Sequence, residues 1–521
     1  MTQLSPLDLA IVGVYIAGMT LMGVWFTRKQ KDLRTYFVGG RNVGWFMVLM
    51  SIVATETSAV TFLSVPGLAY NPKGGNMTFL QLALGYIVGR CVVSWLLLPL
   101  YMRGDLFSAY QILRERFSPA VQRVASGLFL VTRTVADGLR LFLTALLMRY
   151  IGISMEAAIV LVGVVTIVYT YLGGMKAVIW TDLVQFLIKI AGAALAGIFV
   201  LILLPGGWDQ FVAVGTETGK FKTFEFGFDL ASDANIWAGV IGGAVFSMAS
   251  HGADQLMVQR YLCARSLPQA RLALVLSGFT IFAQFVLFLG VGVGMYALRE
   301  AGQFPAAYEA KSNDDVFGLF IVSELPTGVV GILVAAVLAA AMSTLASSLN
   351  SSANALVTDF YRPLRPQHSE RWYVFVSRLM TVAWGIAQMG VAYAAWQLGS
   401  DESVVKRVLA VAGFTTGLLL GLFVLGTFRV RVASWAAIWG LVCGFVTVFL
   451  AWLPSTGLTA DLPGWVPEFY KKPFLAWPWF APLGAGTTIV VALLLNLFSP
   501  PHGSAPESAN GSPEPGLDPA R

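Results

Sequence analysis

Long apolar runs alternate with short polar segments along almost the whole chain. Most runs reach or exceed the roughly 20 residues that a helix needs to cross about 30 Å of hydrocarbon. Several are longer still, which implies helices that are tilted, broken or extended beyond the bilayer. The pattern predicts thirteen membrane-spanning helices, at about residues 7–26, 44–70, 78–101, 120–148, 155–172, 178–204, 236–259, 270–298, 327–360, 372–398, 407–427, 432–453 and 477–498.

The composition strengthens this interpretation, because 57% of the 521 residues are hydrophobic and only 12% are charged. An ordinary soluble domain has about 25% charged residues, so this chain could not cover its own core with polar surface. A soluble multi-domain enzyme, a disordered scaffold and a coiled coil are therefore excluded, and an all-α polytopic membrane protein is predicted. The three cysteines, Cys91, Cys263 and Cys443, are far apart and fit neither a disulfide framework nor a metal site.

Lysine and arginine are distributed unequally between the two sides of the predicted bundle. Of the 34 basic residues, nineteen lie on the side that carries the loop after the first helix, ten on the other side and five inside predicted helices. The positive-inside rule therefore places the N-terminus outside and the C-terminus in the cytoplasm of a cell with this protein in its plasma membrane. No basic helix with interleaved aromatic residues occurs, so nucleic-acid binding is not expected. Residues 499–521 are rich in Pro, Ser and Gly, which predicts a disordered tail.

The second predicted helix carries a polar run at its centre, ATETS at residues 54–58, with the carboxylate of Glu56 in the middle. A charge at membrane depth costs at least about 2.5–3.5 kcal/mol on insertion scales, so it needs a partner or a function. One interpretation is an unwound segment whose free backbone carbonyls bind a cation. The other is a continuous helix in which Glu56 pairs with an arginine of a neighbouring helix.

The ninth predicted helix carries a row of hydroxyl groups among small residues. Ser343, Thr344 and Ser347 share one face by the spacing of an α-helix. Neutral hard oxygens of this kind, combined with carbonyls, suit Na⁺ better than a divalent cation, which prefers carboxylates. Close packing of helices through small residues is the alternative explanation of the same run.

In the seventh predicted helix, a glycine follows a Ser-His pair at mid-span, which predicts a helix break at residues 250–252. A histidine alone is more often a hydrogen-bonded structural residue. His251, Asp254 and Gln255 on successive turns instead favour the lining of a cavity. The seventh helix is therefore a second candidate for a broken span.

The fourth predicted helix places Arg133, Asp137 and Arg140 on one face, at spacings of four and three residues. This arrangement predicts internal ion pairs, and it leaves one arginine that could contact an anionic substrate group. Asp182 lies near the start of the sixth predicted helix, where it could simply cap the helix together with Thr181.

Four motifs follow one another along the chain: YFVGGRNVGWF with ATETSAVTF, YTYLGGMKAVIWTDLVQF, ADQLMVQRYLCARS and AAAMSTLASSLNSSANALVTDFY. With these motifs the chain resembles the sodium/solute symporter family over about residues 5–450. The resemblance implies the leucine-transporter architecture, in which two inverted five-helix repeats each begin with a broken helix. The implied divisions are an extra helix and cytoplasmic loop at 1–43, a first repeat at 44–204, an external loop at 205–235, a second repeat at 236–427, two further helices at 428–498 and the tail at 499–521.

The resemblance also implies binding residues. Backbone carbonyls and two hydroxyls would form the main sodium site: Ala54, Thr57, Ala340, Ser343 and Thr344. A second sodium site, where present, would use Asp182, Ser343 and Ser347, although Ala346 stands where another serine is expected. The residues expected to contact the substrate are Glu56, Ser58, Thr61, Gln81, Ser247, Ser250, His251, Asp254 and Gln255, with Arg140 as the candidate contact for an anion.

The expected function is that of a sodium-coupled secondary active symporter, which imports a small polar organic solute by alternating access and works as a monomer among membrane lipids. Proton coupling through Glu56, Asp182 or Asp254 is one alternative, and a passive channel is another. An enzyme is not expected, since no metal-ligand spacing, nucleophile motif or phosphate loop occurs. Glu56 favours a cationic or hydroxyl-rich solute and Arg140 an anion, so the substrate class stays open.

Overall fold

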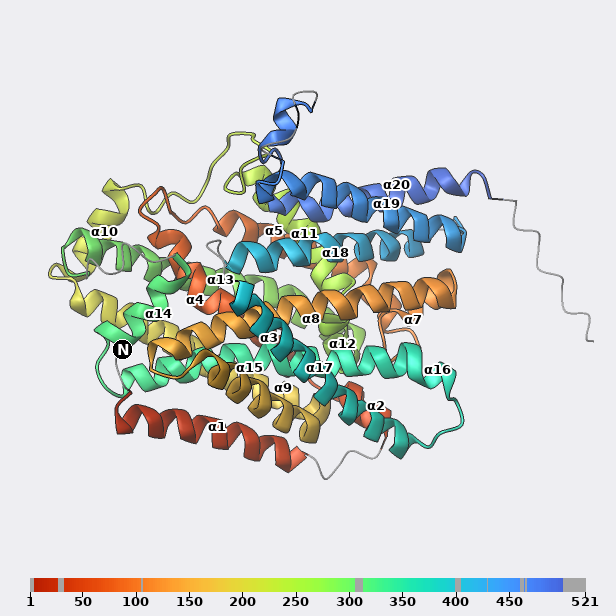
Figure 1. The fold of residues 1–521 in the computed structure, drawn as a ribbon, viewed down its shortest axis with the longest axis horizontal. Helices are drawn as coiled ribbons and strands as arrows, with labels where there is room; N and C mark the ends of the chain where they lie inside the picture. The colour runs from red at the N-terminus through yellow and green to blue at the C-terminus, as the bar shows by residue number, and fades with distance from the viewer. Residues whose placement is uncertain are drawn as a thin grey trace, which may run out of the picture.

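The computed structural model describes residues 4–26, 32–104, 106–304, 313–398, 404–428, 430–459, 463 and 466–499. In these ranges the regular structure is helical, and most of the long helices lie side by side along the long axis of the molecule (Figure 1). No β-strand occurs within them, although one isolated parallel bridge joins Val43 to Ala264. The all-α class predicted from the sequence is confirmed.

The helices are, in chain order, α1 (Pro6–Phe26), α2 (Leu33–Val38), α3 (Trp45–Glu56), α4 (Ala59–Tyr70), α5 (Leu80–Leu96), α6 (Leu98–Tyr101), α7 (Gln111–Arg116), α8 (Pro119–Tyr150), α9 (Met155–Leu203), α10 (Gly207–Glu217), α11 (Gly243–Gly252), α12 (Gln255–Leu262), α13 (Leu267–Glu300), α14 (Asn313–Glu324), α15 (Val329–Ala355), α16 (Arg362–Leu364), α17 (Glu370–Leu398), α18 (Val404–Thr427), α19 (Ser434–Trp452) and α20 (Phe480–Asn496). Two stretches of π-helix, Ala238–Gly242 and Leu356–Tyr361, precede α11 and follow α15.

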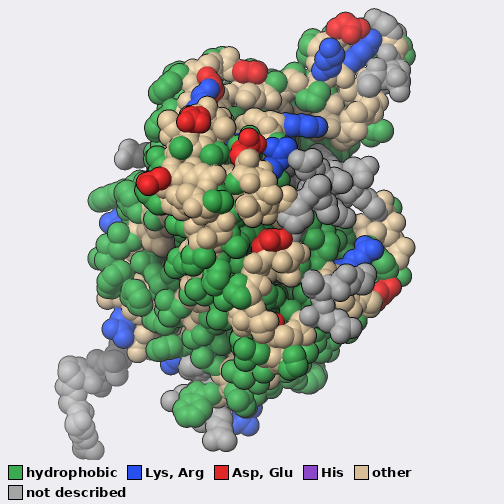
Figure 2. Space-filling view, turned by 90° about the vertical axis from the view of Figure 1, so that its left-hand side faces the viewer, with side chains coloured by type: hydrophobic (Ala, Val, Ile, Leu, Met, Phe, Trp, Pro, Cys, Tyr) green, Lys and Arg blue, Asp and Glu red, His purple; other side chains and the backbone are tan. Residues whose placement is uncertain are grey.

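Seven of the described helices are long and apolar enough to cross a membrane: α1, α9, α13, α15, α17, α19 and α20. The pair α3 and α4 forms an eighth candidate span, bent by 64° at a short break. On α1 the side chains of Val14, Leu21 and Trp25 are 73%, 69% and 81% exposed, as expected of a helix that faces lipid. Figure 2 looks onto the end of the molecule where α1 begins, and hydrophobic side chains cover much of its flanks. The protein is a membrane protein, and the count of thirteen spans stays a prediction.

The break between α3 and α4 lies inside the polar run of the second predicted span. Thr57 leaves the helical region, with φ −76° and ψ 77°, and Ser58 begins α4 by accepting a hydrogen bond from the backbone N–H of Thr61. The hydroxyl of Thr61 donates in turn to the backbone carbonyl of Glu56, at 3.3 Å. Serine and threonine side chains thus replace part of the hydrogen bonding that the break removes, as membrane helices require.

A second break separates α11 from α12. It lies at Ala253 and Asp254, slightly after the predicted position of 250–252. The reason is the capping preference of aspartate, because the Asp254 carboxylate accepts a hydrogen bond from the backbone N–H of Leu256 at 2.8 Å and so starts the new helix there.

The predicted spans at 155–172 and 178–204 are joined in one long element, α9, which is kinked at Gly174 with φ 57° and ψ −168°. These angles are open essentially to glycine alone. Asp182 lies two turns beyond the kink, inside the second half of α9, and the hydroxyl of Thr181 donates to the backbone carbonyl of Val178. The helix-capping role considered for Asp182 is therefore wrong, because no helix begins at that residue.

The second half of α9 packs closely on α15. A Cβ atom placed on Gly192 would lie 2.9 Å from the Cβ of Ala336, so the absence of a side chain at Gly192 permits this approach. The ring of Phe62 on α4 lies against the same position. Three elements that carry polar residues, the α3–α4 pair, α9 and α15, therefore meet in the interior of the bundle.

Candidate functional site

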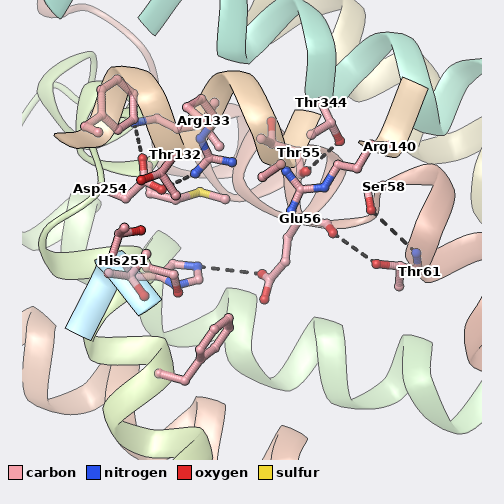
Figure 3. A pocket seen from close by; sticks show the side chains of 18 of the residues that line it. Thr55, Glu56, Ser58, Thr61, Thr132, Arg133, Arg140, His251, Asp254 and Thr344 are labelled. Carbon is pink, nitrogen blue, oxygen red and sulfur yellow. Dashed lines mark hydrogen bonds and ion pairs between the residues drawn. The ribbon is translucent and has the colours of Figure 1, made fainter. Parts of the chain in front are cut away.

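A cavity of about 140 Å³ lies where the two broken helices face α8, α15 and α18 (Figure 3). Its polar lining consists of Thr55, Glu56, Ser58, Thr61, Thr132, Arg133, Arg140, Ser250, His251, Asp254, Thr344, Thr415 and Thr416. The apolar and aromatic lining consists of Tyr86, Phe129, Ala136, Phe246, Leu256, Met257, Phe285 and Leu419. The cavity thus combines charged groups and hydroxyls with apolar and aromatic side chains, and Phe129 of α8 lies under the guanidinium of Arg133 on the same helix.

Glu56 projects into the cavity from the end of α3 and forms an ion pair with Arg90 of α5. One guanidinium nitrogen of Arg90 lies 2.6 and 2.5 Å from the two carboxylate oxygens, and another donates to the hydroxyl of Ser277 at 2.7 Å. The Nε2 atom of His251 lies 3.6 Å from the same carboxylate, and Nδ1 of His251 lies 2.9 Å from the Ser250 hydroxyl. Both sequence interpretations thus apply in part, since the helix is broken and Glu56 has an arginine partner.

A chain of charges runs along one wall of the cavity. Arg133 of α8 pairs with Asp254 at the α11–α12 break, and it also lies 3.7 Å from Asp137 on its own helix. Asp137 forms a second ion pair with Arg140, one turn further along α8. The predicted ion pairs within α8 are present, and Figure 3 shows that Arg133 and Arg140 approach the cavity from the same helix.

Three residues expected to contact the substrate lie outside the cavity lining. Gln81 donates to the backbone carbonyl of Ala234 at 3.0 Å, and so holds the segment that precedes α11. Ser247 donates to the backbone carbonyl of Tyr86 at 3.2 Å. Gln255 accepts from the backbone N–H of Ala109 at 2.7 Å. Each side chain is used in joining two segments of the protein, and a substrate role for these three stays an untested prediction.

The backbone carbonyls of Ala54 and Thr57, two of the expected main sodium ligands, point at a lysine. The Nζ atom of Lys189 on α9 donates to them at 2.6 and 3.0 Å. Lys189 is fully buried. The break between α3 and α4 therefore exposes carbonyl oxygens to a positive charge, which is the electrostatic property that a cation site at this position needs.

The hydroxyl ligands expected from α15 lie against α3 and α9. Ser343 donates to one carboxylate oxygen of Asp182 at 2.7 Å. Thr344 donates to the backbone carbonyl of Thr55 at 2.9 Å and lies 3.3 Å from that of Ala340. Because both hydroxyls donate their hydrogen atoms to these acceptors, the lone pairs of their oxygen atoms stay available to a cation.

The second expected sodium site contains an arginine. The other carboxylate oxygen of Asp182 accepts from the Ser51 hydroxyl at 2.5 Å and lies 3.3 Å from a guanidinium nitrogen of Arg260. The same nitrogen of Arg260 donates to the hydroxyls of Ser347 and Thr55. Arg260 thus provides the positive charge that the buried Asp182 requires, and the cluster joins α3, α9, α12 and α15.

Sequence reasoning missed the partners of these groups rather than the groups themselves. Lys189 follows Asp182 by seven residues, which places both on one face of α9, and this spacing is a usable signal. Arg90 is a lone arginine in an apolar run, and Arg260 lies within one of the four motifs. The Thr415–Thr416 pair, which lines the cavity from α18, also stands out in its apolar surroundings.

Comparisons with known proteins agree with one another. The model of the family described as "Sodium:solute symporter family" matches residues 36–444. The sodium/sialic acid symporter SiaT of Proteus mirabilis is 29% identical over 450 residues, which cover 85% of this chain and 89% of that protein. The sodium/sialic acid symporter NanT of Aliivibrio fischeri is 30% identical over 446 residues, covering 85% of this chain and 86% of that protein.

Solved structures match as well. A Na⁺-coupled sialic acid symporter in a substrate-bound, outward-open state is similar with a TM-score of 0.82 and 26% identity, over 95% of this chain and 99% of that one. A nucleobase-cation-symport-1 family transporter in a closed conformation matches with a TM-score of 0.55 over 89% of this chain and 94% of that one. Its identity is 12%, so this second match concerns the fold alone.

Proposed function

Because this chain belongs to the sodium:solute symporter family, we propose that it imports a small hydroxylated organic anion, of the carboxylate class, together with Na⁺. Sodium-coupled symport of a small polar solute by alternating access is the activity that the family assigns to the chain. Two relatives are named as sialic acid symporters, and a sugar acid belongs to the proposed substrate class.

The observation that carries the proposal is the incomplete pairing of Arg140 at the cavity wall. Its single ion-pair partner among the described residues is Asp137, which also lies near Arg133. The Nε atom of Arg140 is buried and has no hydrogen-bond partner among the residues that the structure describes. A guanidinium with unused donors is suited to a carboxylate, which can accept two parallel hydrogen bonds.

Glu56 supports an anionic rather than a cationic solute once its partner is considered. Both of its carboxylate oxygens are bound by Arg90, so its negative charge is already neutralised. His251 also lies 3.6 Å from this carboxylate. Three other polar groups near it, Ser58, Thr61 and Ser250, are hydroxyls that line the cavity. They suit the hydroxyl groups of a solute, since a hydroxyl can both donate and accept.

Sodium coupling has a physical route in this arrangement. Thr344 is a proposed ligand of the main sodium site and also lines the cavity, while Ala54 and Thr57 flank the cavity residue Glu56 in sequence. Na⁺ bound by Ala54, Thr57, Ala340, Ser343 and Thr344 would join α3 to α15 and add a positive charge beside the cavity. That charge would favour the binding of an anion. Opening the site inward would then weaken the binding of Na⁺ and of the anion together.

The proposal extends to the placement in the membrane. It comprises thirteen spans, two inverted five-helix repeats, an outside N-terminus, a cytoplasmic C-terminus, and function as a monomer in the plasma membrane. In support, the described part of α1 begins at one end of the bundle and α20 ends at the other (Figure 1), as an odd number of spans requires. The second sodium site at Asp182, Ser343 and Ser347 is left out of the proposal, because Arg260 holds Asp182 and Ser347.

Uptake into proteoliposomes tests this proposal. The purified chain is reconstituted, and labelled sialic acid, a short monocarboxylate, iodide and a neutral sugar are offered with and without an inward Na⁺ gradient. A carboxylate should accumulate above its external concentration only with the gradient. The Arg140→Gln variant should raise the KM for that solute by about tenfold or more, since a charge-assisted hydrogen bond is lost.

The matched control is Arg149→Gln, which removes an exposed arginine from the last turn of the same helix and should leave uptake unchanged. Accumulation of the neutral sugar alone, or an Arg140→Gln variant with an unaltered KM, would contradict the anion proposal.

A further inference from the structure

Lys189 holds a position that is unusual for a buried lysine. Its side chain is fully buried, and no carboxylate of the described residues lies within 4 Å of Nζ. Its hydrogen bonds within the described chain are to two neutral carbonyls, those of Ala54 at 2.6 Å and Thr57 at 3.0 Å. A buried ammonium is normally paired with a carboxylate, because desolvation of an unpaired charge is costly. Here the free backbone carbonyls at the end of α3 take the place of a carboxylate.

The two carbonyls are also the proposed α3 ligands of sodium. Hard neutral oxygens bind an alkali cation and an ammonium by the same electrostatic attraction, at comparable contact distances. Two positive charges within a few ångströms of each other in the protein interior repel by several kcal/mol on an effective dielectric of about 20. The carbonyls of Ala54 and Thr57 therefore accommodate the Lys189 ammonium or a sodium ion, but not both.

We propose that Lys189 is a tethered cation that competes with Na⁺ for the main sodium site, so that Na⁺ binds there only after Nζ has left the two carbonyls. This inference rests on the proposed function and its main sodium site. Without Na⁺, Lys189 joins the break in α3 to α9. With Na⁺, the break is joined to Ser343 and Thr344 of α15 instead. Lys189 then sets the concentration of Na⁺ that the symporter needs.

When Nζ leaves the two carbonyls, the nearby carboxylate of Asp182 still has a positively charged partner. Asp182 lies two helical turns before Lys189 on α9, and its positive partner is Arg260, at 3.3 Å. Asp182 also accepts hydrogen bonds from Ser51 and Ser343. The exchange of Lys189 for Na⁺ therefore does not leave a buried carboxylate without a cation.

Sodium binding to the purified full chain tests this inference without any need for transport. Thermal unfolding is followed in mixtures of NaCl and choline chloride at constant ionic strength. The quantity measured is the Na⁺ midpoint, which is the Na⁺ concentration that gives half of the stabilisation. In Lys189→Met this concentration should fall by about tenfold or more, because a competitor held by charge-assisted hydrogen bonds is removed. Lys189→Gln keeps a neutral hydrogen-bond donor, so its half-stabilising Na⁺ concentration should lie between those of Lys189→Met and the parent chain.

The matched control is Lys176→Met, which removes an exposed lysine from the same helix and should leave the midpoint unchanged. An equal or higher midpoint in Lys189→Met overturns the inference. Failure to recover either Lys189 variant in saturating Na⁺ also overturns it, because Na⁺ would fill and stabilise a site that Lys189 had vacated.

A second pair of substitutions separates this inference from the proposed site. Ser343→Ala combined with Thr344→Ala removes two proposed sodium ligands and should raise the midpoint. If that double variant raises the midpoint while Lys189→Met leaves it unchanged, the sodium site stands and the competition is refuted. If neither changes the midpoint, the main sodium site itself is refuted, and the uptake assay alone decides whether symport remains.

Discussion

Glu56 and Arg90 form an ion pair beside the cavity, across 34 residues of sequence. The Arg90 side chain has no exposed surface, while that of Glu56 is 17% exposed, toward the cavity. A buried charge that loses its partner costs far more than the pair itself contributes. The pair therefore has two functions, since it presents a carboxylate to the cavity and keeps Arg90 compensated.

Glu56→Gln should lower the stability of the folded protein by about 3–5 kcal/mol, because the charge of Arg90 is left unpaired in the interior. The measurement is thermal unfolding of the purified variant in detergent. The double variant Glu56→Gln with Arg90→Met should recover part of the loss, since it removes the unpaired charge as well. A single variant as stable as the parent would show that water or another group compensates Arg90.

At the scale of single elements, the kink of α9 decides how two spans are connected. Gly174 has φ 57° and ψ −168°, a conformation that costs any residue with a Cβ atom about 1–3 kcal/mol. The kink sets the direction of the second half of α9, which carries Asp182 and Lys189. A small change at Gly174 would therefore affect groups far from it along the helix.

Gly174→Ala should destabilise the protein by about 1–3 kcal/mol and weaken Na⁺ binding, both measurable from unfolding curves with and without Na⁺. Gly197→Ala is the matched control on the same helix. Its added Cβ would lie 3.5 Å from a methyl group of Val291, an ordinary contact, so this variant should be neutral or slightly stabilising. If the two substitutions had equal effects on stability and Na⁺ binding, the kink at Gly174 would not be the cause of either effect.

The C-terminal end of α4 is bound by Lys220, from the segment after α10. Its Nζ donates to the backbone carbonyls of Ala69, Tyr70 and Asn71 at 3.1, 3.2 and 2.7 Å, and lies 3.9 Å from the ring centre of Tyr296. The last carbonyls of the helix attract an ammonium, but this attraction does not fully offset the desolvation of the buried charge. Burial, with a smaller contribution from a nearby arginine, lowers the pKa of Lys220 from 10.5 to about 8.

This lowered pKa predicts a pH dependence with a definite sign. Between pH 8 and 10.5 the unfolded chain keeps the proton of Lys220 while the folded chain loses it, so stability from this group rises with pH. The contribution is complete above about pH 10.5 and disappears as the pH falls through 8. The melting temperature of the parent minus that of Lys220→Met should therefore increase from pH 8 to pH 10. A difference that shrinks over this range would contradict the lowered pKa.

At the scale of the whole molecule, the distribution of basic loops and the positions of the two described ends predict opposite sides for the termini. An epitope tag placed before Met1 should bind antibody on intact cells. A tag placed after Arg521 should bind only after the cells are made permeable. The reverse pattern would invert the proposed orientation, and equal access to both tags from one side would require an even number of spans.

Much of the architecture follows from the sequence because its causes are local. Transfer of an apolar run into the membrane and hydrogen bonding within one helix depend on residues that are near each other along the chain. For this reason the polar runs around Glu56 and His251 indicated both broken helices, and the hydroxyls of Ser343 and Thr344 indicated a polar face on α15. Asp254, a strong helix-capping residue, placed the second break slightly later than expected.

The tertiary structure alone decided the partners of the buried charges. A lysine or arginine at membrane depth must meet an acceptor, but the sequence does not say which distant helix supplies it. Lys189 meets carbonyls more than 130 residues earlier in the chain, and Arg260 meets Asp182 across 78 residues. These pairings depend on how helices pack, and packing depends on the shapes of all of them at once. The same packing turns Gln81 toward backbone groups and away from the cavity.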